Sequence, residues 1–375
     1  MKDPRTTILT KNLLDYSLDL KEGEKLYIEV RGKETLNLGK ELVTQAAQKG
    51  AVPFWFYNDD SILRKWILFA SEEQMKRFGE FHLRIMKAVD AYIVLRGSDN
   101  FFDLAGVPEE KMGWYQKHFY QPVHLEERVK NKKWCVLRYP SNSMAQLAET
   151  SQEEFEDFFY KVCNLDYSKM SKAMDPLVRL MEKTDRVRIT GKDTEITFSI
   201  KDIPVVKCDG KRNIPDGEVY TAPVKDSVNG QISYNAPALY QGVNYEGIRL
   251  EFKDGKIVKS TSTNNREKLE ALFNTDEGSK YTGEFALGLN PHIKKPLKDI
   301  LFDEKISGSI HLTPGSCYDE ASNGNKSAIH LDLVLIQTKE YGGGEIYFDD
   351  QLIRKDGIFV HPELKDKLSD KSLKS

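Results

Sequence analysis

Apolar residues in the first 140 positions recur with two different spacings, and the two spacings alternate along the chain. Apolar residues three or four positions apart predict helices over residues 5–21, 34–48, 72–88 and 108–130. Short apolar runs between them predict strands over residues 25–30, 52–57, 91–95 and 134–138. Strands that alternate with helices of this length pair in parallel through right-handed crossovers. We therefore expect an α/β N-terminal domain, a flavodoxin-like or Rossmann-like parallel sheet flanked by helices.

A mostly helical stretch over residues 151–185 follows this alternating pattern. Ser151 and Glu154 predict a capping box at its start. Further along, Asp175 followed by Pro176 predicts a second helix that begins at the proline. These helices are interpreted as the bridge between two domains, residues 1–184 and residues 185–375.

Residues after Arg186 show the pattern of antiparallel β-structure. Short strands are expected over 186–189 and 195–200, and Gly, Asp and Asn pairs separate the later apolar runs. Asn229-Gly230 and Asp254-Gly255 lie between alternating runs, which predicts hairpin turns. One helix is expected over residues 266–272, so the C-terminal domain is predicted to be α+β and mainly antiparallel β.

Composition and charge restrict the class of protein. A net charge of -3 gives no reason to expect nucleic acid or an anionic membrane as a partner. No apolar run approaches the roughly 20 residues that span a bilayer, and the charged N-terminus lacks a signal peptide's apolar core. We therefore expect a cytoplasmic protein. The four cysteines form no CxxC pair and are interpreted as reduced thiols. The first strand is followed by Arg31-Gly32-Lys33-Glu34, which is not a nucleotide-binding glycine loop.

Histidines occur in both of two strands predicted within residues 307–335. In the first strand, His311 shares one face with Ser309 and Thr313, because side chains alternate between the faces of a strand. In the second strand, predicted over 328–335, His330 and Asp332 share a face opposite to Leu331, Leu333 and Leu335. An imidazole and a carboxylate are thus expected side by side.

Two glutamates upstream extend this group of polar residues. Glu218 and Glu284 each follow a glycine at the edge of an apolar strand. Together with His311, His330 and Asp332 they supply three carboxylates and two imidazoles, a ligand set that suits two divalent ions such as zinc, cobalt or manganese. Tyr318 follows in the connecting loop and could place a phenol near an activated water or an oxyanion. Each residue alone also has an ordinary explanation, as a solvated charge or a packed histidine.

Several segments together resemble the thermophilic-type metallo-aminopeptidases, the aminopeptidase T and aminopeptidase S family. The resemblance covers most of the chain and is most specific in the C-terminal half, where motifs occur in the family's order. The motifs are PSNSMAQLAETSQEEF (140–155), GEVYTAPVKDSVNG (217–230), TDEGSKYTGEFALG (275–288), SIHLTPGSCY (309–318) and KSAIHLDLVL (326–335).

The resemblance implies a pair of metal ions that catalyse removal of the N-terminal residue from short peptides. It places the metal ligands at Glu218, Glu284, His311, His330 and Asp332, and Tyr318 at the metal centre. It also implies a homodimer. The chain departs from the family in a compact loop before His330 and in Thr313-Pro314-Gly315, where Ala-Leu-Gly is more usual; both changes concern substrate preference.

Two other functions stay open at this point. The first is a dinuclear hydrolase of another amide or ester bond, and the second is a non-catalytic, metal-stabilised homologue. Glu284 and Glu218 are the candidates for the general base, and the sequence does not decide which of them is ligand and which is base.

Overall fold

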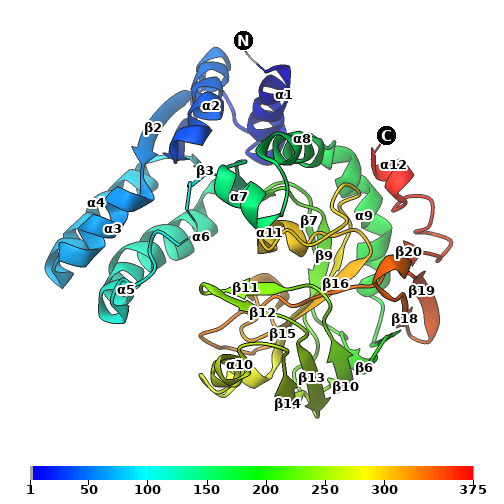
Figure 1. Ribbon diagram of the computed structural model, residues 1–375. Coiled ribbons are helices and arrows are strands. Elements are labelled where there is room, and N and C mark those ends of the chain that lie inside the picture. Colours follow the sequence, from blue (N-terminus) through cyan, green and yellow to red (C-terminus); the bar gives the residue numbers. More distant parts are fainter. Residues whose placement is uncertain (1–2, 101, 375) are drawn as a thin grey trace. The chain divides into compact units, whose positions relative to one another are not determined.

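The computed structural model describes residues 3–100 and 102–374, and the chain forms two compact units (Figure 1). The first unit holds the chain up to Asn164 together with Gly210–Pro215. The second holds Leu165–Asp209 and the chain from Asp216 onward. The predicted boundary near Thr184 differs from this division because helix α9 (Tyr167–Met181) packs against strands β7 and β9 of the second unit. Residues 1–184 and 185–375 as functional domains stay a prediction.

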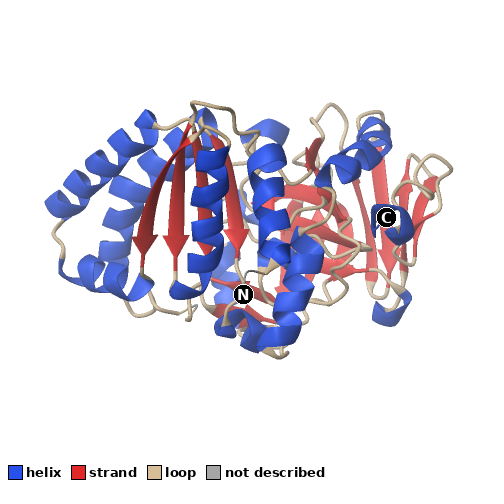
Figure 2. Ribbon diagram, turned by 90° about the horizontal axis from the view of Figure 1, so that it is seen from above, coloured by secondary structure: helices blue, strands red, loops and turns tan. Residues whose placement is uncertain are grey.

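The first unit is built on a five-stranded sheet with the strand order β2-β1-β3-β4-β8. All neighbouring strands in this sheet run parallel, and helices lie on both sides of it (Figure 2). The predicted α/β architecture of the N-terminal half is therefore confirmed. The strands are β1 (Lys25–Arg31), β2 (Val52–Asn58), β3 (Ala91–Arg96), β4 (Lys133–Arg138) and β8 (Asn213–Ile214).

The helices of this unit follow the predicted pattern with several differences. Helix α7 was not predicted, and the helix predicted over 5–21 ends at Ser17 in a π-helical turn. Helix α3 was not predicted; Asp59 caps it by accepting hydrogen bonds from the N–H groups of Ser61 and Ile62. The helix predicted over 108–130 is divided, and its middle part is π-helical and contains Pro122, which has no N–H to donate. The helical segments are α1 (Pro4–Asn12), η1 (Leu13–Ser17), η2 (Lys33–Thr35), α2 (Leu36–Gln48), α3 (Asp60–Phe69), α4 (Glu72–Ala88), α5 (Glu109–Tyr115), η3 (Gln116–Arg128), α6 (Val129–Asn131), α7 (Asn142–Leu147) and α8 (Gln152–Cys163).

The second unit contains two antiparallel sheets, which confirms the predicted mainly antiparallel C-terminal half. The larger has the order β14-β13-β10-β6-β5-β18-β19-β20, and the smaller has the order β17-β16-β15-β9-β7. The rings of Phe198 in β6 and Phe285 in β15 meet at 5.0 Å, so the core of this unit lies between the two sheets. The described chain has no helix long and apolar enough to cross a membrane.

The strands of the larger sheet are β5 (Arg186–Gly191), β6 (Thr194–Ser199), β10 (Asn229–Ser233), β13 (Arg249–Lys253), β14 (Lys256–Thr261), β18 (Gly344–Phe348), β19 (Gln351–Lys355) and β20 (Ile358–Phe359). Those of the smaller sheet are β7 (Val206–Cys208), β9 (Glu218–Thr221), β15 (Thr282–Gly288), β16 (Ser309–Pro314) and β17 (Val334–Ile336). A separate hairpin and short helical segments complete the unit: β11 (Ala238–Tyr240), β12 (Val243–Tyr245), α9, α10 (Arg266–Phe273), η4 (Gly278–Lys280), α11 (Ile300–Asp303), η5 (Asp319–Ala321), η6 (Lys339–Tyr341) and α12 (Asp370–Lys374).

Two local predictions in the second unit were wrong. Pro176 lies inside α9 instead of starting a helix, because Asp166 already caps this helix by accepting from the Lys169 N–H. Asn229-Gly230 lies within strand β10 and not at a turn. A Cβ on Gly230 would lie 2.2 Å from the Glu195 carbonyl oxygen, so this glycine allows a close approach of two strands.

The turn predicted at Asp254-Gly255 was correct. It connects β13 to β14, with positive φ angles of 50° at Asp254 and 80° at Gly255. The strand predicted over 328–335 is shorter than expected, because only Val334–Ile336 pair as β17. The preceding residues make isolated contacts, such as the hydrogen bond from the Leu331 N–H to the Pro314 carbonyl.

Candidate metal centre

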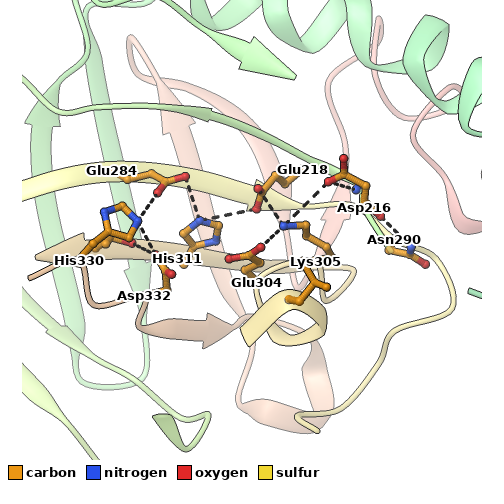
Figure 3. A network of polar contacts seen from close by, with 12 residues as sticks. Asp216, Glu218, Glu284, Asn290, Glu304, Lys305, His311, His330 and Asp332 are labelled. Carbon is orange, nitrogen blue, oxygen red and sulfur yellow. Dashed lines mark hydrogen bonds and ion pairs between the residues drawn. The ribbon is translucent and has the colours of Figure 1, made fainter. Parts of the chain in front are cut away.

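One face of the smaller sheet brings together three of the predicted ligands. Glu218 lies on β9, Glu284 on β15 and His311 on β16, and these strands are neighbours. Ala286 pairs with His311, and Gly288 pairs with Glu218, so small residues lie between the longer side chains. This alternation leaves room on the face, and the three polar side chains turn toward one another (Figure 3).

His330 and Asp332 reach the same place from the irregular segment that precedes β17. His330 Nε2 lies 3.1 Å from Glu284 Oε2 and 3.2 Å from Asp332 Oδ1. His311 Nε2 lies 3.3 Å from Glu284 Oε1 and 3.7 Å from Glu218 Oε2. The structure therefore gathers all five residues predicted as metal ligands, and the two oxygens of Glu284 face different histidines (Figure 3).

Surrounding groups fix the orientation of His330 and Asp332. His330 Nδ1 lies 2.7 Å from the Ser316 carbonyl oxygen, and since a carbonyl only accepts, Nδ1 carries the hydrogen. This tautomer leaves Nε2 of the neutral ring with a lone pair that points at the carboxylates. Asp332 Oδ1 accepts a hydrogen bond of 2.8 Å from the Thr313 hydroxyl. Such supporting hydrogen bonds are typical of metal ligands.

The buried carboxylates attract positive charge. Burial favours the neutral imidazole of His311, but the carboxylates of Glu284 and Glu218 outweigh burial and raise its pKa to about 9. Burial likewise lowers the pKa of His330, whereas Asp332 and Glu284 raise it by a larger amount. In Glu284, burial favours the protonated form, yet the two histidines hold the pKa below its usual range. Without a metal ion, protons on the histidines therefore balance the charge of this site.

The donor atoms fit divalent metal ions. One group of mutually close donor atoms comes from Glu284, His311 and Asp332, and another from Glu218, Glu304 and His311; within each group the atoms lie within 4.8 Å of one another. Glu218 Oε2 and His330 Nε2 are buried and have no hydrogen-bond partner among the described residues. Buried polar atoms without partners are rare in folded proteins, and here both atoms face the other donors. Nitrogen and carboxylate oxygen are ligands that zinc, cobalt and manganese accept.

A buried lysine adjoins this cluster and was not found from the sequence. Lys305 follows α11 and is fully buried; its Nζ lies 3.1 Å from Glu218 Oε1 and 3.9 Å from Asp216 Oδ1. It also contacts the carboxylate of Glu304. The charged run Asp303-Glu304-Lys305 gave no signal in the sequence, because such runs are usually solvated. Lys305 holds one oxygen of Glu218 and leaves the other oxygen facing His311 (Figure 3).

Replacing Lys305 with Met is expected to lower the free energy of unfolding by about 3–5 kcal/mol, because the change leaves buried carboxylates without their cation. Urea unfolding followed by circular dichroism measures the effect. Lys259→Met is the matched control: Lys259 pairs with Glu251 at the surface, where an ion pair contributes only about 0–1 kcal/mol. Equal stability losses in the two variants would contradict the structural role of Lys305.

Tyr318 lies at the edge of the cluster. Its ring centroid is 4.8 Å from that of His330 and 5.6 Å from that of Tyr220, and the residue is 49 % exposed. It is thus a neighbour of a candidate ligand on the open side of the site, and its catalytic role stays a prediction. Cys317 beside it is a free thiol whose Sγ donates to the Asn325 carbonyl, which is a packing role. The groups of mutually close donor atoms found in the described chain contain His311 but not His330, which adjoins them through its contacts with Glu284 and Asp332. They contain none of the other five histidines either: His82, His118, His124, His292 and His361.

Known proteins resemble this chain over most of its length. The family model described as thermophilic metalloprotease (M29) matches residues 4–351. Aminopeptidase T of Thermus thermophilus is 26% identical over 366 residues, which cover 85% of this chain and 89% of that protein. Aminopeptidase PepS of Streptococcus thermophilus is 22% identical over 371 residues, covering 85% of this chain and 86% of that protein.

Solved structures agree in fold. Wild-type AmpT from Thermus thermophilus superposes with a TM-score of 0.78 at 22% identity, covering 95% of this chain and 99% of that chain. A 2,5-dihydroxypyridine dioxygenase from Pseudomonas putida KT2440 superposes with a TM-score of 0.62 at 14% identity, covering 96% of this chain and 98% of that chain. At these identities, the likeness to the solved structures concerns the fold alone.

Proposed function

Because this chain belongs to the M29 family of thermophilic metalloproteases and is an aminopeptidase, we propose that it works through two divalent metal ions bound at the cluster of Glu218, Glu284, His311, His330 and Asp332. The family accounts for a divalent metal and a peptide substrate. Our proposal goes further in three respects: the number of ions, the residues that hold them and the step that they would assist. The observation that carries it is the convergence of three carboxylates, those of buried Glu218 and Glu284 and half-buried Asp332, on two histidine nitrogens.

Glu284 would help to hold both ions, since it lies between the two histidines. Its Oε2 faces His330 and its Oε1 faces His311, so each oxygen belongs to a different side of the cluster. His330 and Asp332 would hold one ion with Glu284, and His311 and Glu218 would hold the other. Zinc, cobalt and manganese all suit this mixed set of ligands.

Two ions held in this way would lower the pKa of a bound water and would polarise the carbonyl of the scissile peptide bond. The chain itself supplies the proton transfer. A carboxylate accepts the proton of the attacking water and passes it to the leaving amine, and Glu284 and Glu218 are the candidates. Tyr318 is proposed to donate a hydrogen bond to the oxyanion from the open side of the site.

An apolar cavity beside His330 and Asp332 supports a peptide substrate. Its volume is about 110 Å³, and its walls include Leu239, Ile300 and Val334. Burial of a side chain there would contribute binding free energy in proportion to the apolar area removed from water. We propose that this cavity receives an apolar side chain of the peptide next to the reacting bond.

Blocking the free amine of the substrate is expected to lower kcat/KM by about 100-fold or more, because carboxylates and metal ions recognise the amine next to the scissile bond. Leucine p-nitroanilide and its N-acetyl derivative form the matched pair of substrates. Comparable rates on both would favour hydrolysis of another amide or ester bond. A metal-loaded protein with no turnover on a panel of peptides would favour a non-catalytic homologue.

Two further parts of the proposal concern the state of the protein in the cell. We propose a homodimer, following the resemblance to aminopeptidases T and S, which size-exclusion chromatography with light scattering tests. We also propose a cytoplasmic location, which is consistent with four free cysteines in the chain.

A further inference from the structure

The parallel sheet of the first unit ends in three arginines that lie side by side. Arg31, Arg96 and Arg138 are the last residues of β1, β3 and β4. They are in register, since Arg31 pairs with Arg96 and Arg96 pairs with Arg138. Residues in register on parallel strands point to the same face, so three guanidinium groups share one end of one face of the sheet.

This end of the sheet is where α/β folds with this topology bind ligands. Strand β1 lies between β2 and β3, so the chain reverses its direction across the sheet at β1 and β3. Ligands of open parallel sheets bind beyond the carboxyl ends of the strands, at this point of reversal. Arg31 and Arg96 terminate the two strands that flank it.

A cavity of about 340 Å³ lies at this place, and all three arginines line it. Ser98, Asn100 and Ser141 add hydrogen-bonding groups, and apolar side chains that include Leu104 and Met112 form another part of the wall. An apolar cavity with a few convergent polar groups is the usual form of a small-molecule site. A neighbouring cavity of about 290 Å³, with Trp66 and Phe78 in its wall, offers further apolar surface.

Arg31 and Arg96 differ in their ion pairs. Arg31 is neutralised, because its guanidinium pairs with Glu29 at 2.6 Å and with Asp60 at 3.0 Å. Arg96 has no ion pair or side-chain hydrogen bond with any residue among 3–100 and 102–374. Close by, Arg128 is buried against the rings of Tyr92 and Trp134, and its Nε and Nη1 have no hydrogen-bond partner in the described chain.

The buried polar groups of this face are unusual for a parallel sheet. Strands that are covered on both faces are normally apolar throughout. The face of β1 that points away from the arginines follows this rule, because its residues Leu26, Ile28 and Val30 are apolar and buried. Glu29 is also buried, in the middle of β1, where Tyr92 donates a hydrogen bond to its Oε2 at 2.5 Å. This network orients Arg31 and fixes the wall of the cavity before any ligand arrives.

We propose that this cavity binds a small organic anion, whose carboxylate or phosphate is held by Arg96 and Arg138 and whose apolar body packs against the wall around Met112. A planar guanidinium binds either head group through two parallel hydrogen bonds. The proposal is independent of the metal centre, and it gives the first unit a binding function of its own. Neither the family nor the proposed peptidase reaction assigns such a site.

Isothermal titration calorimetry on the metal-loaded, full-length protein tests the proposal. The probes are phenylacetate, phenyl phosphate and uncharged benzyl alcohol. We expect one of the two anions to bind about tenfold or more tightly than benzyl alcohol, because a charge-assisted pair is lost in the alcohol. The stronger of the two anions identifies the head group as a carboxylate or a phosphate.

Variants locate the binding. Arg96→Gln is expected to weaken binding of the preferred anion about tenfold or more, and Arg96→Lys is expected to retain part of it. Arg77→Gln is the control, since Arg77 is exposed on α4 and pairs with Glu73. Leu104→Trp, which fills the cavity without removing a charge, is expected to block binding as well. The proposal is overturned if neither anion binds, or if binding is unchanged in Arg96→Gln and Leu104→Trp, which would place it elsewhere.

Discussion

Replacement of Glu284 with Gln is expected to lower kcat by about 10²–10⁴-fold, the range in which a positioned proton-transfer group contributes to catalysis. Glu284 is buried, and its two oxygens face His311 and His330 at 3.3 and 3.1 Å. The amide keeps the shape of the side chain but supplies only one oxygen and no negative charge. Steady-state kinetics on leucine p-nitroanilide at saturating metal measures the loss.

Glu277→Gln is the matched control for this experiment. Glu277 lies shortly before β15 and forms an exposed ion pair of 2.8 Å with Lys256. Its replacement is expected to leave kcat within about twofold, because exposed ion pairs contribute little. An unchanged kcat in Glu284→Gln, in a protein that unfolds at the same urea concentration as the parent, would exclude Glu284 from the reaction.

Removal of the metal is expected to abolish activity, with a loss of about 10³-fold or more, since in the proposed reaction the ions would supply both the activated water and the polarised carbonyl. The protein is treated with a chelator, freed of it by dialysis and assayed. Zinc, cobalt or manganese is then added singly, and at least one of these ions is expected to restore turnover. The pattern of restoration identifies the metals that the site accepts.

The control for metal removal is a check that the chelated protein stays folded. The far-ultraviolet circular dichroism of the chelated protein is expected to match that of the parent, because protons on His311 and His330 balance the buried carboxylates when no ion is bound. Full activity in a protein shown by elemental analysis to be free of metal would refute a metal-dependent reaction.

Two signals in the sequence pointed to the candidate ligands: alternation within strands for the histidines and Asp332, and a preceding glycine at a strand edge for Glu218 and Glu284. Glu218, Glu284 and His311 lie on neighbouring strands of one sheet, so residues singled out separately in each strand come together in the folded chain. His330 and Asp332 were found in spite of a wrong assumption: the segment that carries them is not a regular strand. Their two-residue spacing sufficed, because an extended irregular segment also turns alternate side chains the same way.

Other features depended on contacts that no local pattern reveals. Lys305 is buried beside Asp216 and Glu218, which lie 87 positions or more earlier in the chain, and its neighbours in sequence gave no sign of that. Gly230 has the sequence of a hairpin turn but serves the approach of β10 to β6. The pairing of β10 with β6 is needed to tell a glycine within a strand from a glycine at a turn.

The three arginines of the first unit could be predicted from the sequence only in part. The three predicted strands in the centre of the sheet each have an arginine at their carboxyl end. These residues are Arg31, Arg96 and Arg138. The pattern is visible without a structure, but its meaning depends on the register that aligns the three residues and on the cavity beside them.

The metal content of the protein and of two ligand variants tests the central claim most directly. Inductively coupled plasma mass spectrometry after equilibration with the activating ion is expected to give two ions per chain for the parent. His330→Ala and Glu218→Ala, which are placed on opposite sides of Glu284, are each expected to retain one ion or none, because removal of a ligand lowers the affinity of its own site. Two ions retained in both variants, or fewer than two in a fully active parent, would contradict a dinuclear centre at this cluster.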